Sequence, residues 1–196
     1  MNGQIGSKRL EWMTKHFLCF VAFGMIGWIY EVAVMYFEMH MGYVNRGFLY
    51  GPCLPIYGFG GSLIILLFGG LKKRGWKVWK MDLMPFVCFC GICAMATALE
   101  LFASYLLERL VGHSLWDYRG TGFGPTFEGR IALGSSLRFG VIGIGVLYGV
   151  YPLLEKGLRS FRKKFPQGYW MAASLIAACF MIDLLYHVIY GSNANW

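Results

Sequence analysis

Residues 16–37 of the chain read HFLCFVAFGMIGWIYEVAVMYF and contain one carboxylate, Glu31, and no lysine or arginine. A helix needs about 20 predominantly apolar residues to cross the hydrocarbon core of a bilayer. Four more apolar stretches are as long or nearly as long: residues 49–71, 81–109, 137–154 and 168–191. The sequence therefore predicts an all-α integral membrane protein with five transmembrane helices.

Lysine and arginine residues gather in three segments: before the first predicted span, between the second and third, and between the fourth and fifth. They are Lys8, Arg9, Lys15, Lys72, Lys73, Arg74, Lys77, Lys80, Lys156, Arg159, Arg162, Lys163 and Lys164. Five spans place all three segments on one side, which the positive-inside rule makes the cytoplasmic side. We therefore expect a multi-pass plasma-membrane protein with its N-terminus inside and its C-terminus outside.

The formal net charge of +8 agrees with this topology. In a soluble protein, such a charge would suggest a nucleic-acid partner. In a membrane protein, the basic segments instead attract anionic lipids at the inner face of the bilayer. We expect the lipid bilayer, and not nucleic acid, to be the partner of these segments.

The chain is predicted to form a single transmembrane domain, residues 16–191, between a polar N-terminal segment, residues 1–15, and a short outer tail, residues 192–196. Within residues 47–61, Pro52 and Pro55 each lack an amide donor, and five glycines weaken helical structure. This composition predicts a broken or re-entrant stretch before the second helix. A long, glycine-rich outer loop is expected between the third and fourth helices.

Polar residues inside the spans are the main functional signal. In the third span they recur at intervals of three and four residues, which places them on one helix face: Thr97, Glu100, Ser104 and Glu108. Glu31, Asp183 and His187 fall in the outer halves of the first and fifth spans. A charge at the centre of a membrane helix costs about 2.5–3.5 kcal/mol on insertion scales, so these groups need partners or water.

We interpret these residues as the lining of an outward-facing polar cavity, walled by the first, third and fifth helices and covered by the two glycine-rich loops. The predicted substrate-binding residues are Glu31, Asn45, Arg46, Glu100, Asp117, Arg130 and Arg138. The secondary candidates are Tyr50, Glu108, Tyr118, Asp183 and His187. Glu31 and Glu100 would bind a cation, a proton or a substrate amine, and Arg46 and Arg130 would hold a carboxylate or phosphate. In the alternative interpretation these residues are structural ion pairs that fix helix register and hold the loops, with Asp117 capping a turn.

Motifs of several enzyme classes are absent from the sequence, including GxxxxGK[ST], HExxH and GxSxG. On a helix, Cys88 points about 200° away from Cys90, and no histidine accompanies Cys88, Cys90 and Cys93, which favours packed thiols over a metal site. We expect no metal and no cofactor. Carboxylates with a histidine could perform acid–base chemistry, but the sequence favours an enzyme less than a transport protein.

Several motifs resemble those of a family of small bacterial membrane proteins. They are VNRGFLYGPCLPIYGFG (residues 44–60), LLERL (106–110), WDY (116–118) and GRIAL (129–133). Over about residues 16–155 the chain resembles the family named "Putative ABC-transporter type IV". The resemblance implies a polytopic plasma-membrane protein of the permease type, and it implies no particular binding residues. An ABC permease needs a cytoplasmic coupling element for its ATPase, and the predicted inner loops are short and basic, which argues against a separate ATPase subunit.

We therefore predict a membrane transport protein or permease-like component with a small-molecule or lipid ligand. The alternative is a membrane-embedded enzyme or lipid-headgroup-binding protein that acts at the outer leaflet. A structural partner subunit is a third reading, suggested by Gly145 and Gly149, whose GxxxG spacing suits close helix contact. Five spans do not form two equal halves, so an inverted-repeat transporter would require a homodimer.

Overall fold

The computed structural model describes residues 2–38, 40, 42–43, 45, 49–78, 81–114 and 116–190. Within this part of the chain, five helices are long and apolar enough to cross a membrane: Ser7–Glu38, Pro55–Arg74, Met84–Arg109, Leu133–Lys164 and Pro166–Tyr190. No more than 22% of the apolar window of any of these helices is buried inside the protein. Exposed apolar surface on this scale, along helices of this length, is typical of membrane-spanning segments. The prediction of a helical multi-pass membrane protein is confirmed.

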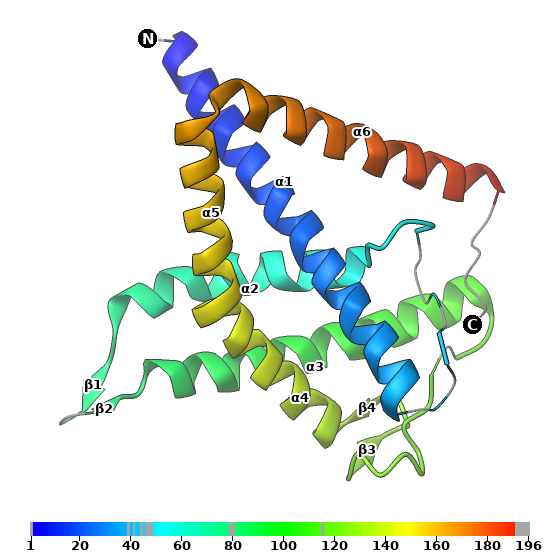
Figure 1. The fold of residues 1–196 in the computed structure, drawn as a ribbon. Coiled ribbons are helices and arrows are strands. Elements are labelled where there is room, and N and C mark those ends of the chain that lie inside the picture. The colour runs from blue at the N-terminus through cyan, green and yellow to red at the C-terminus, as the bar shows by residue number, and fades with distance from the viewer. Residues whose placement is uncertain are drawn as a thin grey trace. The chain divides into compact units, whose positions relative to one another are not determined.

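The elements follow one another along the chain as Figure 1 shows. They are α1 (Asn2–Ala33), the π-helical turn η1 (Val34–Glu38), α2 (Pro55–Arg74), β1 (Lys77–Val78), β2 (Met81–Asp82), α3 (Met84–Val111), β3 (Thr126–Phe127), β4 (Ile131–Ala132), α4 (Leu133–Gly145), η2 (Val146–Val150), α5 (Tyr151–Lys164) and α6 (Pro166–Tyr190). The strands form two antiparallel hairpins, β1 with β2 and β3 with β4.

Two helices extend beyond the predicted spans. Residues 2–15, predicted as part of a separate polar segment, continue α1, because lysine, arginine, leucine and glutamate are good helix formers whether or not they lie in lipid. The fourth apolar helix covers Leu133–Lys164 instead of residues 137–154. The last turns of this helix are strongly charged, so the apolar stretch in the sequence ends before the helix does.

The second and third helices begin later than predicted. Residues 49–52 form bends, and α2 begins at Pro55, not at Leu49. Proline is well suited to the first turn of a helix, where its missing amide is not needed. α3 begins at Met84 after the β1–β2 hairpin, where the Asp82 carboxylate accepts hydrogen bonds from the amides of Trp76 (3.1 Å) and Met84 (3.0 Å).

Contacts within the chain divide it into two compact units. Unit 1 comprises Met1–Leu63 and Tyr151–Trp196. Its core contains Leu18 of α1 with Tyr169 and Ala173 of α6, and Leu158 of α5 packs against them. In Figure 1 the end of α5 and the start of α6 meet beside the first half of α1.

Unit 2 comprises Ile64–Val150, and its core is made by the end of α2, by α3 and by α4 with η2. The largest fully buried side chains in it include Ile92 and Leu147, and Cys88 is buried beside them as a free thiol. α3 and α4 approach closely at Gly140 and Gly143, where an added Cβ would meet Cys93 and Ile92. Gly145 and Gly149, the predicted contact pair, have no atom of the described residues within 4 Å of such a Cβ.

Candidate functional site

The polar face predicted on α3 contacts the loop that follows α3 and the first turn of α4, all within unit 2. The Thr97 hydroxyl lies 2.7 Å from the Ser136 hydroxyl. Ser104, two turns further along α3, accepts a hydrogen bond from Arg130 at 3.0 Å. Glu100 lies between them on the same face. The residues that helical spacing places on one face therefore do contact the same loop and the same helix start.

Glu100 is the most deeply placed carboxylate of this face. At 1.5 Å per residue it lies about 24 Å along the helix from Met84 and about 16 Å from Val111. Its Oε1 accepts hydrogen bonds from the hydroxyls of Tyr118 (2.5 Å) and Ser135 (3.2 Å). Its Oε2 is buried and has no hydrogen-bond partner among the described residues.

The Glu100 carboxylate also differs from Glu108, Asp117 and Glu128 of unit 2, each of which is paired with an arginine. None of the ion pairs between described residues includes Glu100. Two neutral hydroxyls on one oxygen do not neutralise a carboxylate at this depth, where an uncompensated charge is costly. The site can therefore accept a proton or a bound cation.

Arg130 fastens the loop to α3. Its guanidinium forms an ion pair with Glu108 and lies 3.4 Å from a carboxylate oxygen of Glu128. The Tyr105 hydroxyl donates to Glu128 at 2.6 Å, and the Tyr105 ring lies 4.2 Å from the guanidinium. The hydrogen bond with Glu108 raises the pKa of Arg130 above its ordinary value. Arg130 is thus occupied by carboxylates of the protein.

Asp117 shapes the turn that presents Tyr118. Its carboxylate accepts hydrogen bonds from the backbone amide of Arg119 (2.9 Å) and from the Arg119 guanidinium (2.8 Å). These bonds hold the pKa of Asp117 below its ordinary value, the side-chain bond contributing most. Gly129, at a φ of 72°, lies against Asp117, and a Cβ there would strike the carboxylate. The Tyr118 amide donates to the Gly129 carbonyl at 2.8 Å, which directs Tyr118 toward Glu100.

Arg138, in the second turn of α4, contacts the same loop. Its guanidinium lies 4.6 Å from the centre of the Phe123 ring. Phe123 in turn packs edge-on against Tyr118, with the ring centres 5.7 Å apart. Arg138 is therefore connected to the Glu100 site through two aromatic rings.

Glu31 is the corresponding carboxylate of unit 1. Its Oε1 accepts a hydrogen bond from the Tyr57 hydroxyl of α2 at 2.5 Å. Gly27, one turn earlier in α1, lies directly against the Tyr57 ring, which leaves no room for a side chain. Gly24 lies in the same way against Cys53 and the Leu54 carbonyl. A groove of glycines on α1 therefore receives the start of α2.

Residues of α1 and α6 hydrogen-bond to the chain between α1 and α2. The Asn45 side-chain oxygen accepts a hydrogen bond from the Trp28 indole at 2.8 Å. Asp183 of α6 accepts hydrogen bonds from the backbone amides of Tyr50 (2.9 Å) and Gly51 (2.8 Å). Arg46, the other predicted residue of this loop, lies outside the described residues. His187 follows Asp183 by one turn of α6.

The predicted residues thus form two groups. Glu31, Asn45, Tyr50, Asp183 and His187 belong to unit 1, and Glu100, Glu108, Asp117, Tyr118, Arg130 and Arg138 belong to unit 2. The cavity that would combine both groups stays a prediction.

Sequence reasoning missed two hydroxyl partners, Tyr57 and Ser135. Tyr57 lies in a motif whose prolines and glycines draw attention to the backbone instead of the side chain. Ser135 has no sequence spacing that relates it to Glu100, because the two residues come from different helices.

Comparison with known proteins gives one family. The sequence profile of the family described as "Putative ABC-transporter type IV" matches residues 18–188, so the similarity extends past residue 155, where the resemblance in the motifs ends. No curated protein and no solved structure shows significant similarity to the chain. Because the match covers most of the 196 residues, the chain belongs to the "Putative ABC-transporter type IV" family.

Proposed function

We propose that this chain is a membrane transport protein, or the permease-like component of one, in which Glu100 binds the transported or coupling cation. The proposed site opens to an outward-facing polar cavity built from the intramembrane carboxylates and the loop arginines. The observation that carries the proposal is the Glu100 carboxylate: one oxygen is held by two hydroxyls, and the other is buried without a hydrogen-bond partner in the described part of the chain.

The surroundings of Glu100 support binding that is reversible. Removing one partner of a buried charge pair costs about 3–5 kcal/mol, so a permanently paired acid would release a cation only with difficulty. The hydroxyls of Tyr118 and Ser135 carry no charge and can remain in place while a proton or an alkali-metal ion arrives and leaves. An ionised carboxylate is stabilised by these hydrogen bonds, and the arriving cation supplies the missing charge.

The other polar residues receive different roles in this proposal. Arg130, paired with Glu108 and Glu128, holds the loop that carries Tyr118. Glu31 is a second site for a proton or cation, hydrogen-bonded to Tyr57. Arg46 and Arg138 provide positive charge for an anionic group of the substrate.

The test uses purified protein reconstituted in liposomes on a solid-supported membrane. Rapid jumps in pH, in Na⁺ or in K⁺ are applied, and the transient current is recorded. We expect a current with at least one of these three ions for the wild type, and a loss of tenfold or more in Glu100→Gln. The control is Asp82→Asn, which removes an exposed carboxylate of the β1–β2 hairpin that has no part in the proposed site, and which is expected to retain the current.

Circular dichroism of each variant verifies that the helices are intact. A wild-type protein that gives no current with any of the three ions contradicts the proposed function. A folded Glu100→Gln variant with the wild-type current contradicts the assigned role of Glu100.

A further inference from the structure

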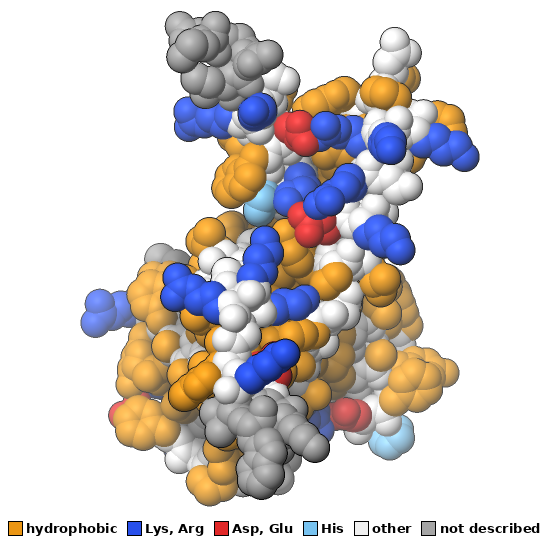
Figure 2. Space-filling view, turned by 90° about the vertical axis from the view of Figure 1, so that its left-hand side faces the viewer, with side chains coloured by type: hydrophobic (Ala, Val, Ile, Leu, Met, Phe, Trp, Pro, Cys, Tyr) orange, Lys and Arg blue, Asp and Glu red, His pale blue; other side chains and the backbone are white. Residues whose placement is uncertain are grey.

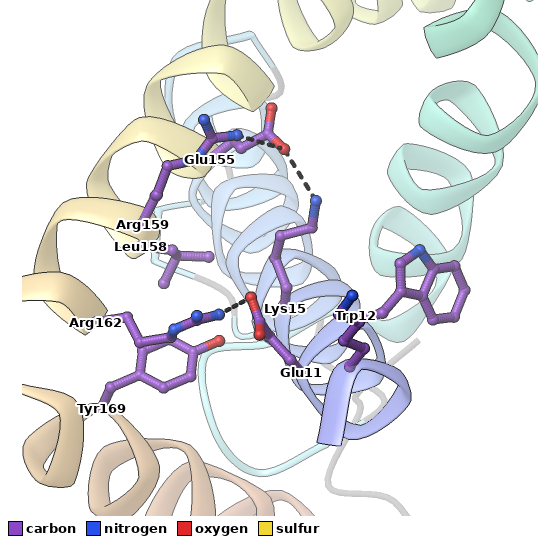
Figure 3. A pocket seen from close by; sticks show the side chains of 9 residues that line it. Glu11, Trp12, Lys15, Glu155, Leu158, Arg159, Arg162 and Tyr169 are labelled. Atoms are coloured by element: carbon purple, nitrogen blue, oxygen red, sulfur yellow. Dashed lines mark hydrogen bonds and ion pairs between the residues drawn. The ribbon is translucent and has the colours of Figure 1, made fainter. Parts of the chain in front are cut away.

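A cleft of about 390 Å³ lies in unit 1, at the end where α1 begins and α5 is followed by α6. It is remote in sequence from the residues of the proposed cation site. In the upper part of Figure 2, lysine and arginine side chains gather on the two projecting parts of the molecule, with acidic side chains among them. Figure 3 shows that the lining comes from all three helices: Glu11 and Lys15 from α1, Glu155 and Arg162 from α5, and Tyr169 from α6.

Two ion pairs hold α1 and α5 together across the cleft. The Lys15 ammonium group lies 2.9 Å from a carboxylate oxygen of Glu155, and Arg162 pairs with Glu11 (Figure 3). The side chains of Lys15 and Glu155 are only 28% and 30% exposed, so this pair lies in the interior of the cleft. These four residues define the shape of the cleft and leave it with no net charge of their own.

Two further basic residues at the edge of the cleft give it a positive charge. Lys8 lines the cleft and forms no ion pair or hydrogen bond with any residue that the structure describes. Arg159 lies 3.6 Å from Glu155, but its side chain is 79% exposed and Glu155 already accepts the closer contact from Lys15. The cleft therefore offers one ammonium and one guanidinium group to a ligand with a net negative charge.

The remaining lining is typical of the membrane interface. Trp12 and Tyr169 lie on either side of the group in Figure 3, and Leu158 lies between the charged residues of α5. Tyr169 is 2% exposed and belongs to the core, whereas Trp12 is 55% exposed. Tryptophan and tyrosine are enriched where lipid headgroups meet the hydrocarbon region. Charge and aromatic side chains at one end of membrane-spanning helices match a lipid better than a solute in bulk water.

We propose that this cleft binds the headgroup of an anionic phospholipid, with phosphatidylglycerol as the best match. The lipid phosphate would lie between Lys8 and Arg159, since ammonium and guanidinium groups both bind phosphate oxygens. Glu11 and Glu155 would accept hydrogen bonds from the hydroxyls of the glycerol headgroup. A choline headgroup offers no hydroxyl or amine hydrogen for these carboxylates. An ethanolamine headgroup would leave the surplus positive charge uncompensated.

The experiment is native mass spectrometry of the full chain in mild detergent after delipidation, with phosphatidylglycerol, phosphatidylethanolamine or phosphatidylcholine added singly. We expect the wild type to retain phosphatidylglycerol at least fivefold more than either other lipid. The double variant Lys8→Gln/Arg159→Gln is expected to lose at least fivefold of this retention. The matched control is Arg9→Gln/Lys156→Gln, which removes the same charge from the same two helices at positions outside the cleft, and should lose less than twofold.

Three outcomes would overturn the proposal. Equal losses in the two double variants would show general electrostatic attraction without a site, and equal retention of all three lipids would show that the headgroup is not recognised. Displacement of phosphatidylglycerol by millimolar glycerol 3-phosphate would assign the cleft to a soluble phosphate ester. The single variant Lys8→Gln, which breaks no ion pair or hydrogen bond between described residues, repeats the comparison if the double variant does not fold.

Discussion

Asp183 accepts a hydrogen bond from the backbone amide of Gly51 at 2.8 Å, across 132 residues of sequence. The second carboxylate oxygen accepts the amide of Tyr50 at 2.9 Å. A carboxylate in the last span thus holds the non-helical chain before α2 through two of its backbone amides. Backbone of this kind is tolerated at membrane depth only when protein groups or water complete its hydrogen bonds.

Asp183→Asn should destabilise the protein by about 1–3 kcal/mol, because the amide side chain presents a donor where an acceptor is needed and leaves one backbone amide unsatisfied. The thermal unfolding midpoint in detergent, followed by circular dichroism, measures the effect. Glu128→Gln, a charge-matched change at a half-exposed side chain, should shift the midpoint much less. Equal shifts in the two variants would show that the Asp183 contact has no special importance.

Gly27→Ala should destabilise the contact between α1 and the start of α2 by about 1–3 kcal/mol, because the added methyl group overlaps the Tyr57 ring and forces repacking. Gly60→Ala, in α2, is the matched control, since an added Cβ meets nothing within 4 Å in the described residues. The control should be neutral or stabilising by about 0.5–1 kcal/mol, as expected for glycine in a helix. Unfolding midpoints that fall equally in both variants would contradict the close contact at Gly27.

Arg130→Gln should loosen the loop between α3 and α4, because it leaves Glu108 and Glu128 without their cation. Hydrogen exchange of residues 116–132 should become faster, and stability should fall by about 3 kcal/mol at most, the range for partly exposed charged hydrogen bonds. The double variant Arg130→Gln/Glu108→Gln should lose less than the sum of the single variants, with a coupling energy of about 0.5–3 kcal/mol. Strict additivity would show that the ion pair contributes nothing.

The β1–β2 hairpin should lose protection in acid. The amides of Met84 and Trp76, in that order of importance, hold the pKa of Asp82 below its usual value of 3.8. Because the folded pKa is the lower one, the stabilising contribution is present above about pH 4 and is lost as the pH falls through the folded pKa. Amide exchange of Trp76 and Met84, corrected for the intrinsic rate, should accelerate in that window. Asp82→Asn should remove the dependence, and protection that declines instead as the pH rises would contradict the assignment.

The five spans could be predicted from the sequence because a bilayer requires long apolar segments, and such segments are visible without knowledge of packing. The common face of Thr97, Glu100 and Ser104 was predictable for a related reason, since helical periodicity alone places residues on one side. Helix ends were less predictable. α5 is charged over its last turns, and α2 starts only at Pro55, which the apolar pattern does not reveal.

Partners between different elements could not be predicted. Tyr118 and Ser135 reach Glu100 from a loop and from another helix, and their positions depend on the turn held by Asp117 and Gly129. The cleft at the start of α1 was also missed, because its lysines and arginines had already been interpreted as topology signals. Only the fold shows that α5 returns beside α1 and places Glu155 next to Lys15.

The contact between Gly24 and Cys53 gives the protein a built-in reporter of its own motions. The Cys53 thiol is buried at the glycine groove of α1, and burial raises its pKa to about 11, so at neutral pH it is almost entirely in the unreactive thiol form. A water-soluble maleimide can label it only when the start of α2 moves away from α1. The labelling rate of Cys53 would therefore measure how often the start of α2 separates from α1, and an ion or lipid could alter this rate without binding near Cys53.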